Sequence, residues 1–390
     1  MNRGLLPKIS FPNILQCKCY MGKSIRPAVG ETIDETDWTE FDEVVDFGGQ
    51  LIFAVDETAG GAPIGPTIEE LRESEERDNP QAGWARAKRA FYRAFKEHGE
   101  FVIGRVRWVG AGQSRDAFSA WIDFPGDSRL SGPYVALLPK SDSDPKTDER
   151  SRREALINKQ LSSLTLPFKI PRVVRLVPEA GRIVVVRDFV DGIRLDLLRG
   201  RQSIAKPWEL IATIASAIHG VSTHVFRKLQ PTFETRRDFA KAKLSKTFQD
   251  DSSESEIRDA FQWAAENIPL PASSTLIHGD LLGQNILLSL RNEATVIDWE
   301  YACLADPAWD LAIVTRGVKK PFGLASGLQL LLESYNQIGR HQISVKDIHF
   351  YELCLAVGWY HQSKRTQPHS GQVQADLARI SAVIRRATTQ

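Results

Sequence analysis

The stretch Leu276–Glu300, LIHGDLLGQNILLSLRNEATVIDWE, decides how the rest of the chain is interpreted. It contains His278, Asp280, Asn285 and Asp298 within a short, otherwise apolar segment. Carboxylate and amide oxygens are the ligands that hard divalent cations such as Mg²⁺ prefer. A carboxylate can also accept a proton from a reacting group. The stretch therefore indicates a site that combines oxygen ligands with a candidate base.

Two β-prone runs in this stretch, Ile286–Leu290 and Ala294–Ile297, are separated by the polar segment 291–293 and predict a hairpin. If the turn is centred on residues 291 and 292, Asn285 pairs with Asp298. Directly paired residues have Cα atoms roughly 4.5–5.5 Å apart, which is close enough for two oxygen ligands to share a cation. A three-residue turn would shift the pairing by one position. The hairpin is predicted, and its register is a hypothesis.

Three sequence blocks follow one another in this region. They are His-Gly-Asp-x-x-x-x-Asn at His278–Asn285, Ile-Asp-Trp-Glu at Ile297–Glu300 and Asp-Pro-x-x-Asp-Leu-Ala at Asp306–Ala312. The blocks resemble the aminoglycoside phosphotransferase/choline kinase family of small-molecule kinases. The first also keeps the Asp-to-Asn spacing of the protein-kinase catalytic loop. A buried hairpin with incidental carboxylates is the alternative, and it would have to produce all three blocks by chance.

The resemblance implies an α+β, bilobal protein-kinase-like fold, with a small antiparallel β lobe and a larger, mainly helical lobe. It also implies ATP or another nucleoside triphosphate as phosphate donor, with Mg²⁺ held by Asn285 and Asp298. Asp280 would be the catalytic base. His278 is the second candidate catalytic residue, and we expect it to support the loop rather than to titrate. Asp310 would brace the catalytic loop by accepting backbone or histidine donors, unless it is an ordinary charge at a helix N-terminus.

Three further β-prone runs, Phe101–Gly110, Ala117–Phe124 and Tyr134–Leu138, predict the antiparallel strands of the small lobe. The loop between the first two supplies the candidate phosphate-binding residues Gly110, Gly112, Gln113 and Ser114. Glycine lets backbone N–H groups approach phosphate oxygens without a Cβ in the way. The third glycine of the protein-kinase loop is absent, and an ordinary hairpin can also have turn glycines.

Lys140 follows the third of these strands and is the candidate cation for the nucleotide phosphates. The resemblance implies that Glu154, on a helix predicted over residues 148–164, holds this lysine. Pro139 stands directly before Lys140 and removes a backbone donor, so the strand must end or bulge there. The alternative is a surface Lys–Glu pair that contributes little stability. A hairpin predicted over residues 173–190 would end in the hinge Arg187–Val190, where backbone groups would bind the base.

A chain of 390 residues is too long for one ordinary core, and we expect three parts. Residues 1–100 form an N-terminal extension that is partly disordered, with a short hairpin at 43–56 and two helices. Residues 101–190 form the nucleotide-binding lobe, and residues 191–390 the catalytic and substrate-binding lobe. Further helices are predicted at 67–79, 83–98, 207–224, 236–248, 254–267, 328–338, 345–362 and 373–388. The helix at 83–98 is basic and amphipathic; it would pack its aromatic stripe on a neighbour, or else bind a membrane or nucleic acid.

Composition excludes several classes of protein. The net charge of +1 gives no global attraction to nucleic acid, and the chain has no run of 18 apolar residues that would suggest a membrane span. Four scattered cysteines, Cys17, Cys19, Cys303 and Cys354, match neither a disulfide framework nor a zinc site. We therefore expect free thiols and a cytoplasmic protein. Either Met1 or Met21 could be the start of translation.

The acceptor of the phosphate is the least determined part of the prediction. The resemblance implies a small hydroxyl-bearing substrate such as an aminoglycoside or an amino alcohol. Tyr351, Glu352, Trp359 and Tyr360 could form an aromatic cage for a quaternary ammonium group, although aromatic residues at helical spacing are more often core. A non-catalytic nucleotide-binding module and a protein kinase are the other two classes. The protein-kinase class is less well supported, because the protein-kinase motifs Asp-Phe-Gly and Ala-Pro-Glu are missing from the sequence. The sequence leaves the oligomeric state open.

Overall fold

A computed structural model describes residues 83–112, 114–140, 144, 146–195, 197, 204–226, 229, 231–248, 254–368 and 371–389, and the backbone of four short strands before them. The chain divides into two compact units, Met1–Asp78 and Asn79–Gln390. In the first unit, β1 (Val44–Phe47) pairs with β2 (Gln50–Phe53), and β3 (Asp56–Glu57) pairs with β4 (Pro63–Ile64). The hairpin predicted at 43–56 is confirmed. The helix predicted at 67–79, Cys17 and Cys19 lie outside the described residues.

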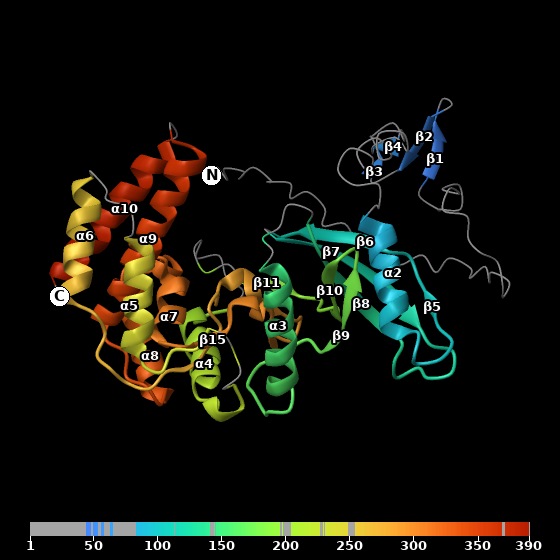
Figure 1. Cartoon of the computed structure of the whole chain (residues 1–390), viewed down its shortest axis with the longest axis horizontal. Helices are drawn as coiled ribbons and strands as arrows, with labels where there is room; N and C mark the ends of the chain where they lie inside the picture. Colours follow the sequence, from blue (N-terminus) through green and yellow to red (C-terminus); the bar gives the residue numbers. More distant parts are fainter. Residues whose placement is uncertain are drawn as a thin grey trace, which may run out of the picture. The chain divides into compact units, whose positions relative to one another are not determined.

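The second unit contains a six-stranded antiparallel sheet (Figure 1). Its strands are β5 (Val102–Ile103), β6 (Arg107–Ala111), β7 (Arg115–Asp123), β8 (Gly132–Pro139), β9 (Val173–Glu179) and β10 (Arg182–Asp188). The order is β5-β7-β8-β10-β9, and β6 also pairs with β7. The second and third predicted strands and the later hairpin are confirmed, with bounds that differ by a few residues, whereas the first predicted strand, 101–110, is divided into the two strands β5 and β6.

Helix α2 (Gly83–Phe95) covers one face of this sheet. Its buried Phe91 and Phe95 share a core with alternate residues of the strands, among them Phe118 on β7 and Leu138 on β8. The prediction that this helix packs its aromatic stripe on a neighbour is confirmed. We propose that the small lobe begins at α2, rather than at residue 101 as the sequence suggested, because the sheet core includes this helix.

The opposite face of the sheet carries the other set of alternating residues, since successive side chains of a strand point to opposite faces. On β7 this set includes Arg115 and Ala117, and on β10 it includes Arg187. Helix α3 (Thr147–Leu161) packs against β9 and β10 and contributes Glu154, whose carboxylate contacts both arginines. This second face of the sheet is the one that bears on the candidate site.

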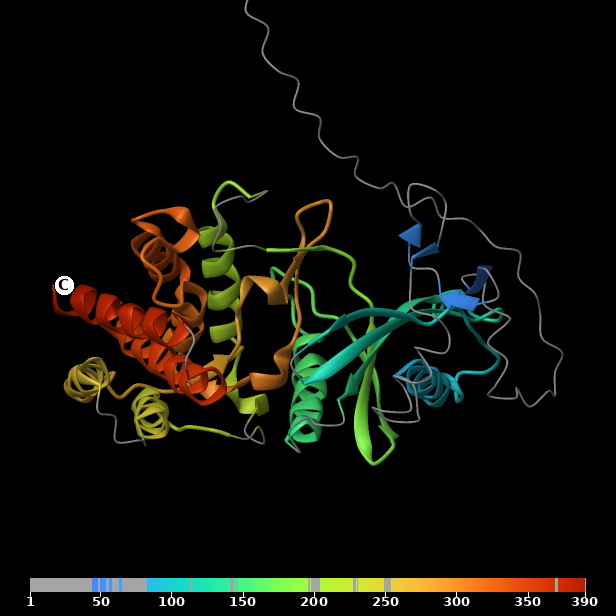
Figure 2. The ribbon, with the colours of Figure 1, turned by 90° about the horizontal axis from the view of Figure 1, so that it is seen from above.

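The remaining residues form a mainly helical lobe (Figure 2). Its helices are α4 (Pro207–His219), α5 (Arg236–Thr247), α6 (Ser255–Glu266), α7 (Ala308–Thr315), α8 (Gly327–Ile338), α9 (Val345–Thr366) and α10 (Gly371–Thr388). Two small sheets support the catalytic segment: β11 (Ile193–Arg194) with β13 (Ile286–Leu288) and β14 (Ala294–Val296), and β12 (Thr275–Ile277) with β15 (Cys303–Ala305).

The local sequence explains where several of these helices begin. Pro207 is the first residue of α4, where its missing N–H costs nothing. Thr235 and Ser344 form capping boxes with the aspartates three residues later, at the starts of α5 and α9. None of the described helices is both long and apolar enough to cross a membrane. Cys303 and Cys354 are buried free thiols, as expected for these two.

Replacing Phe91 tests whether α2 belongs to the core of the small lobe. The Phe91 side chain is fully buried, so Phe91→Ala should lower the free energy of unfolding by about 3–5 kcal/mol. Tyr92 is 57% exposed on the same helix, and Tyr92→Ala should cost less than about 1 kcal/mol. Urea unfolding measures both variants. Equal losses would mean that α2 does not share the sheet's core.

Candidate active site

Asp310 holds the backbone of the catalytic loop in place. It lies in the first turn of α7 and is fully buried. One carboxylate oxygen accepts a hydrogen bond from the backbone N–H of His278 at 2.7 Å, and the other accepts from Gly279 N–H at 2.8 Å. His219 Nε2 lies 3.2 Å from the same carboxylate. The predicted bracing role of Asp310, through backbone and histidine donors, is confirmed.

His278 joins the catalytic loop to the strand that carries Asp298. Its Nε2 lies 3.0 Å from the carbonyl oxygen of Ile297, and its Nδ1 lies 3.3 Å from the backbone N–H of Asp280. An N–H at Nε2 and a lone pair at Nδ1 satisfy both contacts, which is the neutral tautomer. Burial lowers the pKa of His278, so the ring stays neutral. This geometry supports a role in loop conformation rather than in proton transfer.

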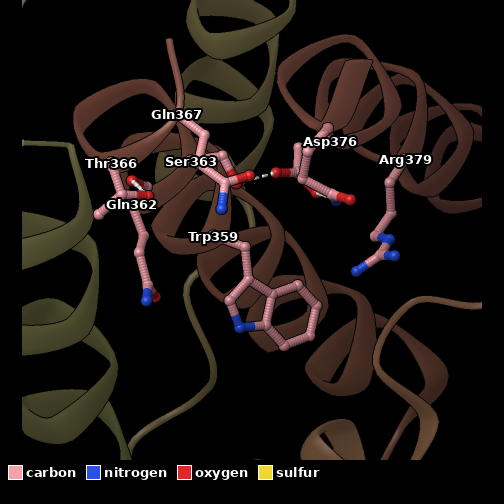
Figure 3. A pocket seen from close by; sticks show the side chains of 8 residues that line it. Trp359, Gln362, Ser363, Thr366, Gln367, Asp376 and Arg379 are labelled. Atoms are coloured by element: carbon pink, nitrogen blue, oxygen red, sulfur yellow. Dashed lines mark hydrogen bonds between the residues drawn. The ribbon is translucent and has the colours of Figure 1, made fainter. Parts of the chain in front are cut away.

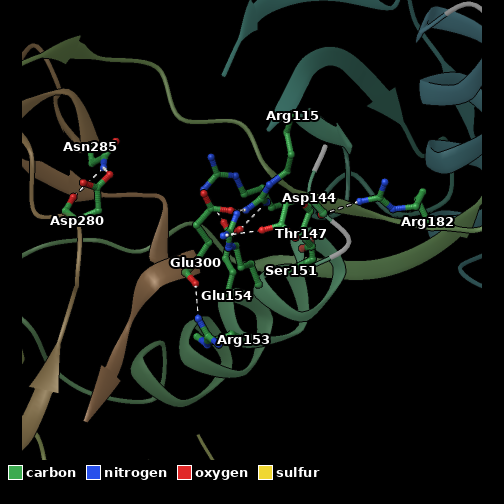
Figure 4. A network of polar contacts seen from close by, with 12 residues as sticks. Arg115, Asp144, Thr147, Ser151, Arg153, Glu154, Arg182, Asp280, Asn285 and Glu300 are labelled. Atoms are coloured by element: carbon green, nitrogen blue, oxygen red, sulfur yellow. Dashed lines mark hydrogen bonds and ion pairs between the residues drawn. The ribbon is translucent and has the colours of Figure 1, made fainter. Parts of the chain in front are cut away.

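Asp280, the candidate base, lies beside Asn285. The Asn285 amide nitrogen donates to the backbone oxygen of Asp280 at 2.8 Å and to its carboxylate at 3.0 Å (Figure 4). Burial raises the pKa of Asp280, although His278 and Asn285 oppose this shift. A carboxylate with a raised pKa is a stronger base. Because its nitrogen faces Asp280, the amide oxygen of Asn285 is left as the group that can bind a cation.

The hairpin register differs from the prediction by one residue. Ile286 pairs with Val296, and Ile297 N–H donates to the carbonyl oxygen of Asn285 at 2.9 Å. Asn285 therefore lies opposite Ile297, and the predicted pairing with Asp298 is wrong. The cause is the turn: Ser289 N–H bonds to the carbonyl oxygen of Glu293 at 3.1 Å, leaving a three-residue loop. Asn292 takes the left-handed conformation, φ 59°, that such loops require.

Asp298 follows β14 in a left-handed conformation, with φ 69° and ψ 55°. This is unusual for a residue other than glycine, and such outliers often lie at functional sites. Burial, with Glu300 and Glu154 nearby, raises the pKa of Asp298 to about 7, while Arg115 opposes the shift. A buried carboxylate among other acids is stabilised by a cation.

Asn285 and Asp298 together offer the oxygen ligands that Mg²⁺ takes. Within the described part of the chain, no three or more His, Cys, Asp or Glu side chains are grouped to hold a metal ion by themselves. Mg²⁺ usually keeps several waters and is bound through one or two protein groups plus phosphate oxygens. The donor set of Asn285 and Asp298 therefore fits Mg²⁺ bound together with a nucleotide.

The expected pair between Lys140 and Glu154 is not the arrangement in the structure. Glu154 is fully buried and accepts from Arg115 Nη1 at 2.7 Å, with Arg187 Nη1 at 3.5 Å (Figure 4). Lys140 Nζ lies 3.8 Å from Asp116 instead. The reason is strand geometry: Asp116 belongs to the set of β7 residues that faces α2, whereas Arg115 belongs to the opposite set.

Arg115 was not predicted from the sequence, and the side chains of Arg187 and Glu300 were given no role there, although Arg187 begins the predicted hinge and Glu300 ends the Ile-Asp-Trp-Glu block. Arg115 bonds to Glu300 as well as Glu154, so one buried guanidinium connects the small lobe to the segment after Asp298. A signal was present in the glycine loop. In Gly110-x-Gly112-x-x-Arg115, the arginine stands where the protein-kinase pattern has its third glycine.

The glycine loop itself is a tight hairpin. Gly112 N–H donates to the carbonyl oxygen of Arg115 at 2.7 Å, and Gly110 has a φ of 153°. A side chain added at Gly110 would meet no atom within 4 Å, so the loop backbone is open on that side. Ser114 accepts a backbone hydrogen bond from Lys140 at 3.1 Å. Gln113 lies outside the described residues.

The described residues of the helical lobe line cavities at two places. One, of about 230 Å³, borders the catalytic loop and is lined by Arg194, Leu195, Leu197, Leu282, Gly283, Gln284, Val314 and Arg316. The other, of about 300 Å³, lies between α9 and α10 and is lined by Trp359, Gln362, Ser363, Thr366, Gln367, Gln372, Asp376 and Arg379 (Figure 3). The first is lined by Leu282, Gly283 and Gln284, which closely follow the candidate base Asp280 in the chain.

The aromatic cage considered for an ammonium group is not formed. Tyr351, Glu352 and Tyr360 are buried in the core of the helical lobe. The Glu352 carboxylate accepts hydrogen bonds from Thr315 and from the backbone of Gly317. Trp359 lines the second cavity, where the guanidinium of Arg379 lies 5.1 Å from its ring. The alternative, that these aromatic residues are core, is confirmed for both tyrosines.

Gly279 offers a test of the catalytic loop's backbone. Its φ is 82°, and a Cβ there would overlap the carbonyl oxygen of Tyr301. Gly279→Ala should therefore lower the free energy of unfolding by more than about 1 kcal/mol and reduce activity. Gly358→Ala is the matched control: no atom lies within 4 Å, and the helix α9 should gain about 0.5–1 kcal/mol. Thermal unfolding measures both, and a stable, fully active Gly279→Ala would contradict the assignment.

Comparisons with known proteins address the family and the fold. A sequence profile described as "Phosphotransferase enzyme family" matches residues 109–335, more than half of the chain. Protein LicA of Haemophilus influenzae (strain ATCC 51907 / DSM 11121 / KW20 / Rd) is 28% identical over 156 residues, or 38% of this chain and 57% of LicA. The chain spans about half the length of the curated relatives it matches.

Solved structures of phosphotransferases resemble this fold. The GDP and kanamycin complex of APH(2")-IIia aligns with a TM-score of 0.54 and 15% identity, covering 77% of this chain and 98% of that one. Macrolide 2'-phosphotransferase type I aligns with a TM-score of 0.53 and 19% identity, covering 75% and 96%. A complex of APH(4)-Ia with AMP-PNP and hygromycin B aligns with a TM-score of 0.55 and 16% identity, covering 77% of this chain and 99% of that one. At these identities the likeness concerns the fold alone, and it confirms the predicted α+β, kinase-like architecture.

The matched profile includes the glycine loop and the catalytic segment, and the fold is that of the aminoglycoside phosphotransferases. The chain belongs to the phosphotransferase enzyme family.

Proposed function

We propose that this enzyme transfers the γ-phosphate of a nucleoside triphosphate to a hydroxyl group of a small molecule, with Asp280 as the catalytic base. One observation carries the proposal. Asp280 has a pKa raised by burial and lies on a loop that Asp310 holds by two backbone hydrogen bonds. A positioned carboxylate of this kind is what proton transfer from an acceptor hydroxyl needs.

The proposed reaction uses this geometry directly. Asp280 accepts the proton of the acceptor hydroxyl while the oxygen forms a bond to the γ-phosphorus. The bond between that phosphorus and the leaving diphosphate breaks at the same centre. Base catalysis of this kind contributes about 10²–10⁴-fold to the rate. The rest of the acceleration comes from positioning and from charge stabilisation around the phosphoryl group.

Asn285 and Asp298 are the proposed ligands of Mg²⁺. When bound, Mg²⁺ would neutralise part of the charge on the nucleotide phosphates. The hydrogen bonds of Asn285 to Asp280 orient the amide, so that its oxygen is presented away from the base. Structural relatives of this fold bind GDP and AMP-PNP, which supports a nucleotide as the phosphate donor.

The cavity beside the catalytic loop is the proposed acceptor site. Its described lining combines leucines with Arg194 and Arg316. Asp280 and Arg316 interact electrostatically. A polycationic acceptor such as an aminoglycoside would be repelled by these arginines, whereas a carboxylate or phosphate on the acceptor would be attracted. Among hydroxyl compounds, this lining favours acidic ones over amino alcohols.

Two substitutions test the proposed roles. Asp280→Asn should lower kcat by about 10²–10⁴-fold and leave nucleotide binding nearly unchanged, because it removes only the proton acceptor. Asp298→Ala should abolish Mg²⁺-dependent nucleotide binding. Asp127→Asn, on an exposed turn, is the control and should change neither quantity. Steady-state kinetics and calorimetry measure these effects, and full activity in Asp298→Ala would contradict the metal assignment.

The acceptor class is tested by release of nucleoside diphosphate. The purified protein is incubated with Mg-ATP or Mg-GTP and a panel of hydroxy acids, sugar phosphates, amino alcohols and aminoglycosides. We expect turnover with an acidic hydroxy compound, and Arg316→Gln should raise the KM for it. Turnover with amino alcohols alone would overturn the acidic acceptor. Tight nucleotide binding without any turnover would favour a binding module, and phosphate incorporated into protein would favour a protein kinase.

A further inference from the structure

The candidate metal ligand Asp298 interacts electrostatically with Arg115, an arginine on the second strand of the glycine hairpin. Arg115 is the first residue of β7 and is only 7% exposed. Its backbone oxygen closes the glycine hairpin through Gly112. The Arg115 side chain therefore starts at the base of the loop whose backbone is expected to bind phosphate.

Arg115 is held from two sides. Its Nη1 donates to Glu154 at 2.7 Å, and its Nη2 donates to Glu300. Although burial opposes charge on Arg115, Glu154, Glu300 and Asp298 raise its pKa, so it stays charged. Asp298 and Glu300 follow each other closely in the chain. The positive charge of Arg115 thus lies at the end of the site where the metal and the phosphates would bind.

The neighbourhood has more negative than positive charge and a donor without a partner. Three acids, Glu154, Asp298 and Glu300, face two arginines, Arg115 and Arg187. In the described structure, the buried Nε of Arg187 has no hydrogen-bond partner. A buried donor of this kind costs stability unless something binds to it. Together with a divalent cation, the cluster is suited to bind an additional anion.

The third strand provides no cation on this face. On β8, Tyr134, Ala136 and Leu138 belong to the core beneath α2. The intervening residues include Leu137, which pairs with Ala117 on the face of Arg115. Lys140 lies beyond Pro139, is 31% exposed, and forms its ion pair with Asp116 at 3.8 Å. On the face of the sheet that carries Arg115, the β8 residue closest to the glycine loop before Pro139 is therefore Leu137.

We propose that Arg115 is the residue that binds the nucleotide phosphates, with Glu154 positioning it, and that Lys140 does not have this role. The proposal rests on the proposed phosphotransferase function. Arginine suits this task because its planar group can bond to a carboxylate and a phosphate at the same time. Glu154 fixes one edge of the guanidinium, which leaves the other groups to exchange between Glu300 and phosphate oxygens.

The test compares binding of triphosphates with binding of nucleosides. ATP and GTP, with Mg²⁺, and adenosine and guanosine are titrated by calorimetry into wild type, Arg115→Met, Arg115→Lys and Lys140→Met. Arg115→Met should weaken triphosphate binding by about 10–100-fold, the equivalent of one charge-assisted hydrogen bond, and leave nucleoside binding unchanged. Lys140→Met should change both by less than about threefold. A merely structural role of Arg115 would weaken nucleoside binding to the same extent.

A relocated cation provides a second measurement. The double variant Arg115→Met/Leu137→Lys places a lysine on the same face of the sheet, and it should recover at least about tenfold of the lost triphosphate affinity. If thermal unfolding shows that Arg115→Met does not fold, Arg115→Lys takes its place in the comparison. It should then weaken triphosphate binding more than Lys140→Met does and leave nucleoside binding unchanged. Loss of triphosphate affinity in Lys140→Met, with Arg115→Lys and Arg115→Met unaffected, would overturn the inference. Failure of the wild type to bind either triphosphate would instead overturn the proposed function.

Discussion

The catalytic loop depends on one buried carboxylate, that of Asp310. The loop that carries Asp280 leaves backbone N–H groups without strand partners, and such groups are costly when buried. Asp310 accepts two of them, from His278 and Gly279. Its charge makes these bonds stronger than neutral ones. The helix α7 that carries Asp310 is buried along its whole length, so the brace is as rigid as the core of the lobe.

A second set of charges joins the two lobes. Arg115 on β7, Glu154 on α3 and Glu300 form one connected group. Arg153 Nη1 adds a bond to the backbone oxygen of Glu300 at 3.0 Å. Buried ion pairs of this kind are weak evidence for stability, because desolvation offsets much of their attraction. Their more certain effect is geometric: they fix where the glycine hairpin lies relative to Asp298.

The sequence predicted the parts of the molecule that local patterns determine. The three motifs contain the candidate residues His278, Asp280, Asn285, Asp298 and Asp310. Periodicity predicted the bounds of most described strands and helices to within a few residues. The Glu154 partner was predicted wrongly, because Arg115 lies 39 positions before it and Glu300 lies 185 positions after Arg115. Choosing between Lys140 and Arg115 required knowing which face each strand residue occupies. The face of each residue depends on the register of β8 up to its end at Pro139, and a shift of one residue would move every side chain of the strand to the opposite face.

The turn at the tip of the catalytic hairpin illustrates how a surface detail is coupled to the interior. Leu290 is fully exposed and Asn292 adopts a left-handed conformation, and neither contacts the site. Together they nevertheless set the number of residues between Asn285 and Asp298, and hence which residue faces which. The length of the turn therefore sets the register of the hairpin that precedes Asp298. A gain or loss of one residue in this turn would shift the register again and change which residue lies opposite Asn285.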